Sequence, residues 1–471
     1  MTGRHVVVVG GGLAGITAAI DLRDAGCEVT LLESRPRLGG AATSYGRAGL
    51  MIDNGQHVFL RCCDRYQALL ARLGVSDLVA IQDRFDVTVL SPAGPARLRR
   101  DGLPSPLHLA RALLRYPLLS LRERARVGRA ALAFRFADPA SPDLDQERLG
   151  SWLAARGQVE RARRHLWDLF IVSALNIDGD EASVSLAATV IKTALLGSRD
   201  AADIGMAKVP LGHLHAEATA VLLASLGAQV RLGTRVASIE RLTEGGFRVG
   251  LSRGAEADDS QASGQSISAD AVVLAVPADQ AAKLAESAGV ARAAAWPGLG
   301  YSPILNVHVC YDRRVTNLPF AAAVDSPVQW VFDKTSQAGV SSGQYLAVSI
   351  SAADDVIDTP TSELRQLFLP ALEQLFPAAA GAEVIDFFVT RERRATFRQA
   401  PGSGGLRPGA ATSVPGLVLA GAWTSTGWPD TMEGAVRSGH EAAQQLSQEL
   451  TAQRSPDRAA GRLDNAWSGA S

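Results

Sequence analysis

The chain has 471 residues, of which 47% are hydrophobic, and carries a formal net charge of −1 at pH 7. This length allows about three domain-sized units with a large core, and the near-neutral charge gives no global attraction for nucleic acid. No apolar run reaches the roughly 18 residues of a membrane-spanning helix, and the N-terminus has no signal-peptide pattern. The four cysteines include no C-x-x-C pair, so we expect no metal site and reduced thiols in the cytoplasm.

The first predicted elements are a buried strand and a helix joined by a glycine-rich turn. Residues 6–9 are four valines, typical of a strand buried on both faces, and residues 16–22 continue as an apolar helix. Between them, Gly10, Gly12 and Gly15 form the pattern G-x-G-x-x-G. The first glycine permits a tight turn, the second lets a pyrophosphate approach the backbone, and the third lets helix and strand pack closely. The turn therefore predicts a dinucleotide site at the helix N-terminus.

A second strand, an acidic residue and a further glycine pair extend this pattern. Residues 28–32 form the strand, which ends in Glu33, roughly 20 residues beyond the turn, where such folds place a carboxylate for the ribose hydroxyls. Arg37-Leu38-Gly39-Gly40 follows directly. This extension resembles the R-x-G-G signature of the FAD-dependent amine oxidase family, which includes protoporphyrinogen oxidases and carotenoid desaturases. The resemblance implies FAD, with the arginine and the glycine pair holding its pyrophosphate and ribityl region.

Residues 53–59, Asp-Asn-Gly-Gln-His-Val-Phe, lie where this family has a segment that passes the flavin. Their histidine, together with residues 173–176 and 423–439, resembles the hydroxysqualene dehydroxylases, a branch of the family. The resemblance implies loss of an allylic hydroxyl from a C30 chain, with hydride delivered from reduced FAD. Such a reaction needs an apolar tunnel and one proton donor near the flavin.

Three side chains are candidates for this chemistry. His57 is the candidate proton donor because its unperturbed pKa lies near neutrality; the alternative is that it only orients the backbone or the flavin. Asp53 is a second candidate, although it also suits a role in fixing the turn or binding FAD. Asn176 could hydrogen-bond the substrate hydroxyl, and it suits a helix C-terminal cap equally well.

A hairpin at 86–99 and a mostly helical stretch at 103–200 follow. Within residues 97–135, ten arginines are opposed by two acidic residues and alternate with leucines. The capping box Ser120-x-x-Glu123 starts a helix there. Arginine and leucine on short helices favour binding in the plane of an anionic membrane surface. The alternative is a solvated basic helix pair that covers the substrate domain.

The second half of the chain alternates helices and strands. Residues 229–232 and 235–239 are predicted strands, and the family resemblance places Val236 near the adenine of FAD. A polar segment at 253–268 is expected to be an exposed, mobile hairpin tip. The remaining predicted elements are a helix at 209–227, strands at 247–252, 271–275, 305–311, 328–332, 345–350 and 384–390, and a helix at 362–375 kinked at Pro370.

A C-terminal motif is expected to complete the FAD site. A short strand at 417–420 leads into Gly421-Ala422-Trp423-Thr424, and Met432 opens a helix. In the family this strand ends at the FAD phosphates, and the positive helix end points at the flavin pyrimidine carbonyl. Ala422 stands where the family usually has aspartate, which implies weaker FAD binding. No cysteine lies within 415–445, so the FAD is expected to be non-covalent.

The sequence therefore predicts an α/β fold: a Rossmann-type, amine-oxidase-like FAD-binding domain interleaved with an α+β substrate domain containing a mixed sheet and a helical cap. The predicted FAD-binding domain is 1–85, 205–290 and 391–452, the substrate domain is 86–204 and 291–390, the membrane-contacting segment is 103–136, and the disordered tail is 453–471. The residues expected to contact FAD are Gly10, Gly12, Leu13, Ala14, Gly15, Glu33, Ser34, Arg37, Gly39, Gly40, Ala41, Gly55, Gln56, His57, Val236, Gly421, Trp423, Met432, Glu433 and Ala435.

The predicted function is FAD-dependent dehydroxylation of hydroxysqualene by a cytoplasmic enzyme that touches the membrane peripherally. Its predicted partners are a lipophilic isoprenoid and an unidentified electron donor, with no nucleic acid. The alternatives are a carotenoid desaturase, an amine oxidase, and a non-enzymatic isoprenoid carrier of the same fold.

Overall fold

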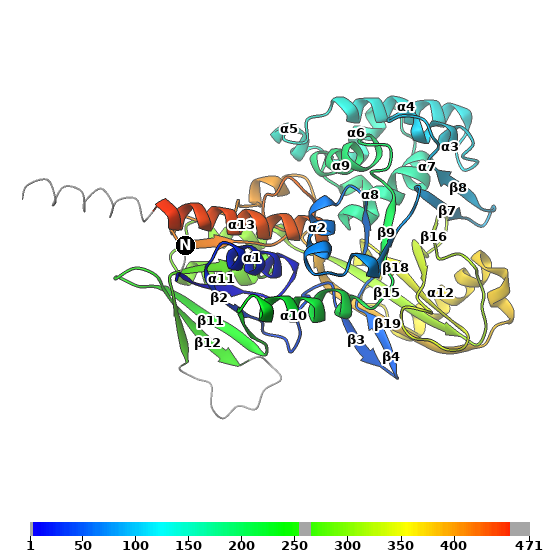
Figure 1. The fold of residues 1–471 in the computed structure, drawn as a ribbon. Helices are drawn as coiled ribbons and strands as arrows, with labels where there is room; N and C mark the ends of the chain where they lie inside the picture. Colours follow the sequence, from blue (N-terminus) through cyan, green and yellow to red (C-terminus); the bar gives the residue numbers. More distant parts are fainter. Residues whose placement is uncertain (1–2, 254–264, 453–471) are drawn as a thin grey trace, which may run out of the picture.

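The computed structural model describes residues 3–253 and 265–452 (Figure 1). The predicted disordered tail at 453–471 lies outside the described residues, as does most of the predicted loop at 253–268. The prediction of a loop is wrong for the end of that segment, because residues 266–269 form strand β13. This strand pairs antiparallel with β12 (Phe247–Arg253), where Ile267 lies opposite Val249.

The glycine-rich turn follows the central strand of a five-stranded parallel sheet. The strand order is β10-β2-β1-β14-β20, and every neighbouring pair is parallel. The valines of β1 are buried, which confirms a strand covered on both faces. The bounds are β10 Gln229–Arg231, β2 Glu28–Leu32, β1 His5–Val9, β14 Ala271–Leu274 and β20 Leu417–Leu419.

One layer covers each face of this sheet. On one face, Val6 and Val8 share a hydrophobic core with α1, α10 and α13. On the other face, Val7 and Val9 pack with α11 and with the small sheet β11-β12-β13. The helix predicted at 209–227 begins at residue 211 and passes through a π-helical turn into α10. The bounds are α1 Leu13–Asp24, π-turn His213–Glu217, α10 Ala218–Ser225, α11 Ala278–Ser287, α13 Met432–Ala452 and β11 Thr234–Arg241.

A seven-stranded mixed sheet forms the second large unit of the fold. Its order is β19-β15-β18-β17-β16-β7-β8, antiparallel throughout except for the parallel pair β16 and β7. Helix α12 covers one face, where Leu364 and Phe368 pack against Leu305 and Val307 of β15. The bounds are β19 Val384–Thr396, β15 Ser302–Tyr311, β18 Gln344–Ile350, β17 Trp330–Asp333, β16 Phe320–Ala323, β7 Asp86–Leu90, β8 Ala96–Arg99 and α12 Thr361–Leu375.

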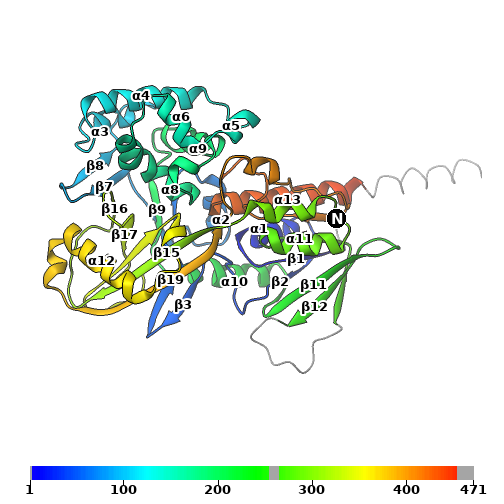
Figure 2. The same ribbon diagram turned by 180° about the vertical axis from the view of Figure 1, so that it is seen from behind.

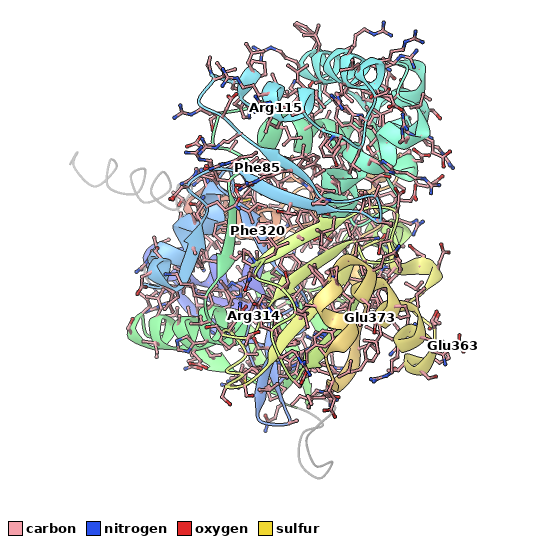
Figure 3. All side chains as sticks on the ribbon, turned by 90° about the vertical axis from the view of Figure 1, so that its right-hand side faces the viewer. Phe85, Arg115, Arg314, Phe320, Glu363 and Glu373 are labelled. Carbon is pink, nitrogen blue, oxygen red and sulfur yellow. The ribbon has the colours of Figure 1, made fainter. Side chains whose placement is uncertain are left out.

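Short helices form a layer above this sheet (Figures 1 and 2). Figure 3 places Phe85 and Phe320 between Arg115 of this layer and the rest of the sheet. The predicted capping box is confirmed: the Ser120 hydroxyl accepts the Glu123 amide, and the Glu123 carboxylate accepts the Ser120 amide. The bounds are α3 Ala110–Leu114, α4 Leu121–Phe136, α5 Pro142–Gln146, α6 Leu149–Ala155, α7 Glu160–Ala162, α8 Asp168–Leu175 and α9 Val184–Val190. Among the helices of the described residues, none is long and apolar enough to cross a bilayer.

Several short elements join the two large units, and the sequence did not predict them. β3 pairs with β4, and β9 pairs with both β5 and β6. Strands of three or four residues carry too little periodicity to be recognised before their partners are known. The bounds are β3 Ser44–Arg47, β4 Leu50–Asp53, β5 Val58–Leu60, α2 Asp64–Arg72, β6 Val79–Ile81 and β9 Ile204–Ala207.

Candidate active site

The glycine-rich turn is built so that side chains would clash. Gly10 has φ of +108°, and a Cβ there would lie 2.3 Å from the Ala275 carbonyl oxygen. A Cβ on Gly15 would lie 1.9 Å from the Gly10 carbonyl oxygen. Gly12 begins α1 as its N-cap without a side chain. The backbone at the start of α1 is therefore bare and can approach a phosphate closely.

Glu33 holds the turn from the neighbouring strand. Its Oε2 accepts the Gly11 amide at 2.7 Å, and its Oε1 accepts the Arg35 amide at 2.8 Å. The Thr234 amide, at the start of the strand that carries Val236, donates to the Glu33 carbonyl at 2.8 Å. The structure thus brings Val236 close to Glu33 at the carboxyl end of β2, where the ribose and adenine are expected.

The Arg37 loop packs backbone to backbone against the turn. The Gly39 amide donates to the Gly11 carbonyl at 2.9 Å, and a Cβ on Gly40 would lie 2.8 Å from the Gly12 Cα. Gly39 and Gly40 both have positive φ, so glycine suits both positions. Ser34, Arg37 and Ala41 of this loop are exposed. The two glycine motifs therefore form one continuous cradle.

The C-terminal helix closes on the same cradle. A Cβ on Gly439 would lie 2.4 Å from the Ala14 carbonyl oxygen, so α13 crosses α1 in backbone contact at the first turn of α1. The Gly421 amide donates to the Ser438 hydroxyl at 2.8 Å, which ties the end of β20 to α13. Met432 and Ala435 are half-buried in the first turn of α13.

Like Glu33, two further residues expected to contact FAD have partners in the protein. The Glu433 carboxylate is 1% exposed and accepts the Tyr66 amide at 2.7 Å at the start of α2, and it pairs with Arg437 at 2.7 Å. The Trp423 indole donates to the Val276 carbonyl at 3.0 Å. Both side chains hold elements of the site together, and the sequence motif did not separate this from cofactor contact.

Unpaired buried polar atoms test whether a flavin cofactor fits. The Gln56 amide oxygen and nitrogen and the Thr43 hydroxyl are buried without a hydrogen-bond partner among the described residues. Each such atom costs roughly 1–3 kcal/mol when left unpaired. Thr43 borders the glycine cradle, since a Cβ on Gly39 would lie 3.6 Å from its Cβ, and Gln56 follows Gly55 in the segment that the family resemblance places along the flavin. A flavin, which carries carbonyl, imide and hydroxyl groups, would supply the missing partners, so the residues present fit FAD.

Asp53 is bound on all sides by protein. It is 4% exposed and accepts Ser44 Oγ at 2.6 Å, the Leu211 amide at 3.0 Å and Gln337 Nε2 at 2.8 Å. It also pairs with Lys334 Nζ at 3.1 Å. These contacts join the β3-β4 hairpin to the seven-stranded sheet. They favour a role for Asp53 in fixing the turn over a role in catalysis.

His57 lies half-buried next to Gly55. A Cβ on Gly55 would lie 3.3 Å from His57 Nε2 and 3.8 Å from Asn306 Nδ2, so the imidazole and the Asn306 amide flank this glycine. Burial lowers the pKa of His57 below its ordinary value, although Asp53 acts in the opposite direction. The near-neutral pKa expected from the sequence is therefore corrected, and the imidazole is mostly neutral at pH 7.

Asn176 caps helix α8. It has φ of +49° and is 3% exposed. Its Nδ2 donates to the Ser302 carbonyl and to Thr396 Oγ1, both at 3.0 Å, and its Oδ1 accepts the Ala352 amide at 2.8 Å. This geometry favours the cap over substrate binding, because both amide hydrogens and the oxygen already have protein partners.

A buried tyrosine and histidine support the cradle, and their pairing was not predicted. The Tyr66 hydroxyl and His215 Nε2 are 2.8 Å apart, and His215 Nδ1 donates to the Ala42 carbonyl at 3.0 Å. Burial lowers the pKa of His215 to about 4, so its imidazole is neutral and the second nitrogen accepts from the tyrosine. The two residues are 149 positions apart in the chain, beyond the reach of any local pattern.

The face of the seven-stranded sheet opposite α12 carries polar residues near Asn306 and apolar residues farther along. Direct cross-strand pairing places Asn306, Ser349, Trp330 and Ala322 in one row on the same face. Next to this row, Phe320, Trp330 and Phe332 have ring centroids 6.2–6.3 Å apart. Asn306 could have been singled out from sequence as the one amide in the apolar run 303–307, with its neighbours Leu305 and Val307 on the opposite face.

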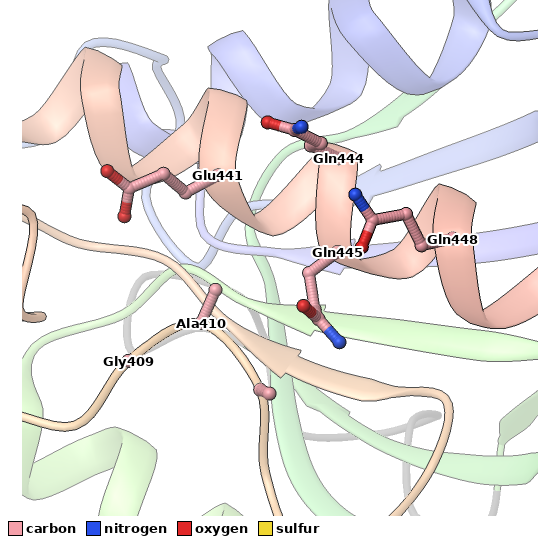
Figure 4. Close-up of a pocket in the computed structure, with 7 residues that line it drawn as sticks. Gly409, Ala410, Glu441, Gln444, Gln445 and Gln448 are labelled. Carbon is pink, nitrogen blue, oxygen red and sulfur yellow. The ribbon is translucent and has the colours of Figure 1, made fainter.

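An open hollow lies beside the later turns of α13. It has a volume of about 410 Å³ and lies between residues 409–411 and α13 (Figure 4). Glu441 and three glutamines of the helix line it. None of the residues expected to contact FAD is in its lining, so the hollow is separate from the predicted cofactor site.

Comparison with known proteins agrees with this geometry. The family model described as flavin containing amine oxidoreductase matches residues 13–447. A hydroxysqualene dehydroxylase of Rhodopseudomonas palustris is 31% identical over 451 residues, covering 93% of this chain and 97% of that protein. A 15-cis-phytoene desaturase of Glycine max is 26% identical, and the match covers 97% of this chain and 82% of that protein. The solved structure of cyclohexylamine oxidase from Brevibacterium oxydans has a TM-score of 0.69 at 20% identity, covering 95% of this chain and 99% of that one.

Proposed function

Because this chain belongs to the flavin-containing amine oxidoreductases and is an FAD-dependent oxidoreductase, we propose that it converts hydroxysqualene to squalene. The observation that carries the proposal is its 31% identity to a hydroxysqualene dehydroxylase over nearly the full length of both proteins. The match includes the FAD cradle and also the segments that form the second sheet and the helical layer, where a substrate would be selected.

The proposed reaction removes one hydroxyl and adds one hydride. The alcohol oxygen takes up a proton and leaves as water, and the allylic carbon then accepts hydride. FAD supplies this hydride in its reduced form, so one alcohol and one reduced flavin give one alkene, one water and one oxidised flavin. The protein must hold the hydroxyl next to a proton source and surround the carbon with groups that cannot trap a cation. His57 lies across Gly55 from the Asn306 amide, and the aromatic rings farther along the sheet are poor nucleophiles.

A desaturase and an amine oxidase are the other candidate activities. The 26% identity to a phytoene desaturase supports the first, and the fold shared with cyclohexylamine oxidase is compatible with the second. A desaturase substrate is a hydrocarbon and needs no hydroxyl site, whereas the free sheet face carries the polar pair Asn306 and Ser349. Membership in an oxidoreductase family argues against a carrier that uses no flavin.

We also propose that the enzyme meets its lipophilic substrate at a membrane surface, through the segment 107–136 that ends with α4. Leu121 is 74% exposed and Phe136 is 79% exposed, and Leu107, Leu114 and Leu132 are also exposed. Exposed arginines alternate with these side chains along α4, which suits binding to anionic headgroups. The electron donor that reduces the flavin stays unidentified.

The test is a single turnover under anaerobic conditions. Enzyme reduced with dithionite is mixed with hydroxysqualene, and flavin absorbance and extracted lipids are followed together. We expect the flavin to be reoxidised and squalene to form in equal amount. Phytoene and a primary amine, each mixed with oxidised enzyme, test the other two activities. Reduction of the flavin by either compound, with no squalene formed from the alcohol, would contradict the proposed function.

A further inference from the structure

We propose that the cross-strand pair Asn306 and Ser349 binds the hydroxyl group of the substrate. This inference rests on the proposed function, because it assigns a place to the alcohol that the enzyme removes. In the sequence, Asn306 stands out only as the one amide in the apolar run 303–307, and Ser349 does not stand out. Three observations support the assignment: the register of the two residues in the sheet, one unpaired atom, and the apolar surroundings.

The register brings the two side chains together. Asn306 of β15 lies directly opposite Ser349 of β18, and Ser349 lies directly opposite Trp330 of β17. Side chains opposite each other in antiparallel strands are about 4.5–5.5 Å apart at Cβ and share one face. That face is the one not covered by α12, since the helix packs on Leu305 and Val307.

One atom of Asn306 lacks a partner. The side chain is 0% exposed, and its Nδ2 donates to the Asn54 carbonyl at 3.2 Å. This contact fixes the orientation of the amide, because the reverse orientation would set two carbonyl oxygens against each other. Its Oδ1 is then a buried acceptor with no donor among the described residues. A buried acceptor of this kind indicates a ligand that carries an O–H or N–H group.

Beyond Asn306, the row is less buried and becomes apolar. Ser349 and Trp330 are both half-buried rather than fully covered, so the row is open on the side that leads away from Asn306. Ala322 lies beyond Trp330 in the same row, and Phe332 lies in the adjacent row. A hydrocarbon would pack along this row, with its one polar group at Asn306 and Ser349.

The two side chains have complementary roles toward an alcohol. Asn306 Oδ1 accepts the hydrogen of the substrate hydroxyl, and the Ser349 hydroxyl donates to its oxygen. The second lone pair of that oxygen stays free to take up a proton. When the C–O bond breaks, the water formed keeps its bond to Oδ1, since water also donates. The His57 ring and the Asn306 amide nitrogen flank the same glycine, Gly55, so we propose that the imidazole is the proton source for the leaving oxygen.

The experiment measures binding of two probes to oxidised enzyme, which cannot turn the alcohol over. Hydroxysqualene and squalene differ only in the hydroxyl group. The variants are Asn306→Leu and Ser349→Ala, and Thr390→Val is the matched control. Thr390 lies opposite Asn306 on the other side, and its hydroxyl also donates to the Asn54 carbonyl, at 3.4 Å. Ser349→Ala removes a single oxygen atom and gives an answer even where Asn306→Leu fails to fold.

We expect each of the two variants to bind hydroxysqualene roughly 5- to 10-fold more weakly and to bind squalene as the wild type does. The control should bind both probes unchanged, and flavin absorbance should be the same in all four proteins. Equal weakening of both probes, together with a shifted flavin spectrum, would assign Asn306 to the flavin and overturn the proposal. Unchanged binding of both probes would overturn it as well. A wild type that prefers the alcohol but forms no squalene would contradict the proposed function and leave the hydroxyl site supported.

Discussion

Burial decides what His57, Asp53 and Asn176 can do. Asn176 has used its hydrogen-bonding capacity within the protein, and Asp53 is held by Lys334 and three further donors. His57 keeps an imidazole beside Gly55 with a pKa lowered by burial. Among the three, His57 alone lies across Gly55 from the Asn306 amide. Its role in proton transfer stays a prediction.

We expect His57→Ala to slow dehydroxylation by roughly 10²–10⁴-fold, because general acid catalysis contributes a factor of that size. The folded-state pKa lies below the ordinary 6.5, so the acid form grows only as pH falls below that value. The wild-type rate of flavin reoxidation by hydroxysqualene should therefore rise as pH is lowered, and the variant should lose this rise. Rapid-mixing absorbance of prereduced enzyme from about pH 5 to 8 measures it.

His213→Ala is the control, since that imidazole is exposed and pairs with Glu217. It should keep the wild-type rate and pH profile, and both variants should keep their FAD. A His57→Ala enzyme reoxidised as fast as wild type would remove this side chain from the mechanism.

Among the elements of the fold, helices α1 and α13 support the site by crossing in close contact at a glycine of α13. Gly439 of α13 faces Ala14 and Thr17 of α1, where a Cβ would lie 2.4 Å from a carbonyl oxygen and 2.7 Å from a methyl-bearing carbon. The first turn of α1 carries the phosphate-binding backbone. The position of the C-terminal helix is thus coupled directly to the N-terminal turn.

Gly439→Ala should force these helices apart and destabilise the protein by about 1–3 kcal/mol, as overpacking in a core does. FAD should also be lost more readily, because the start of α1 moves with the helix. Urea denaturation and the flavin content after gel filtration measure the two effects.

Gly128→Ala is the matched control for that substitution. Gly128 lies in α4, where a Cβ would meet nothing within 4 Å. Alanine there should stabilise the protein by about 0.5–1 kcal/mol, because glycine loses more conformational freedom in a helix. Equal stability and equal flavin content in the two variants would show that the close crossing of α1 and α13 contributes neither to stability nor to FAD binding.

Across the protein as a whole, basic and apolar side chains gather on the helical layer. Arg115, Arg122, Arg126 and Arg129 are exposed there and form no ion pair with the described part of the chain. Figure 3 shows Arg115 on this layer and Arg314 away from it, beyond Phe320. The proposed division of the chain into two interleaved domains places this layer on the substrate side and stays a prediction.

Replacing Arg115, Arg122, Arg126 and Arg129 with glutamine should weaken binding to anionic vesicles by more than about 100-fold, at roughly 1 kcal/mol per residue near the surface. Flavin content should be unchanged, since these residues are remote from the glycine cradle. Co-sedimentation with phosphatidylserine-containing vesicles at low and high salt measures the effect.

A second set of four arginines gives the control of equal charge. These residues lie on the sheet side and are also exposed: Arg313, Arg314, Arg365 and Arg393. Their replacement by glutamine should leave vesicle binding nearly unchanged. If both quadruple variants bind as the wild type does, the helical layer has no membrane role.

Local sequence was enough to predict the turns, caps and strand ends that depend only on residues close together in the chain. The turn at Gly10, the carboxylate of Glu33 and the capping box at Ser120 are local patterns, and the structure has each of them in the predicted place. Which polar side chains stay unpaired depends instead on contacts between distant segments. Asp53 and Asn176 meet partners more than 100 residues away, and Asn306 Oδ1 does not, because strand register sets its oxygen on the free face of the sheet. A side chain's role depends on which atoms remain unpaired after folding, and no local pattern contains that information.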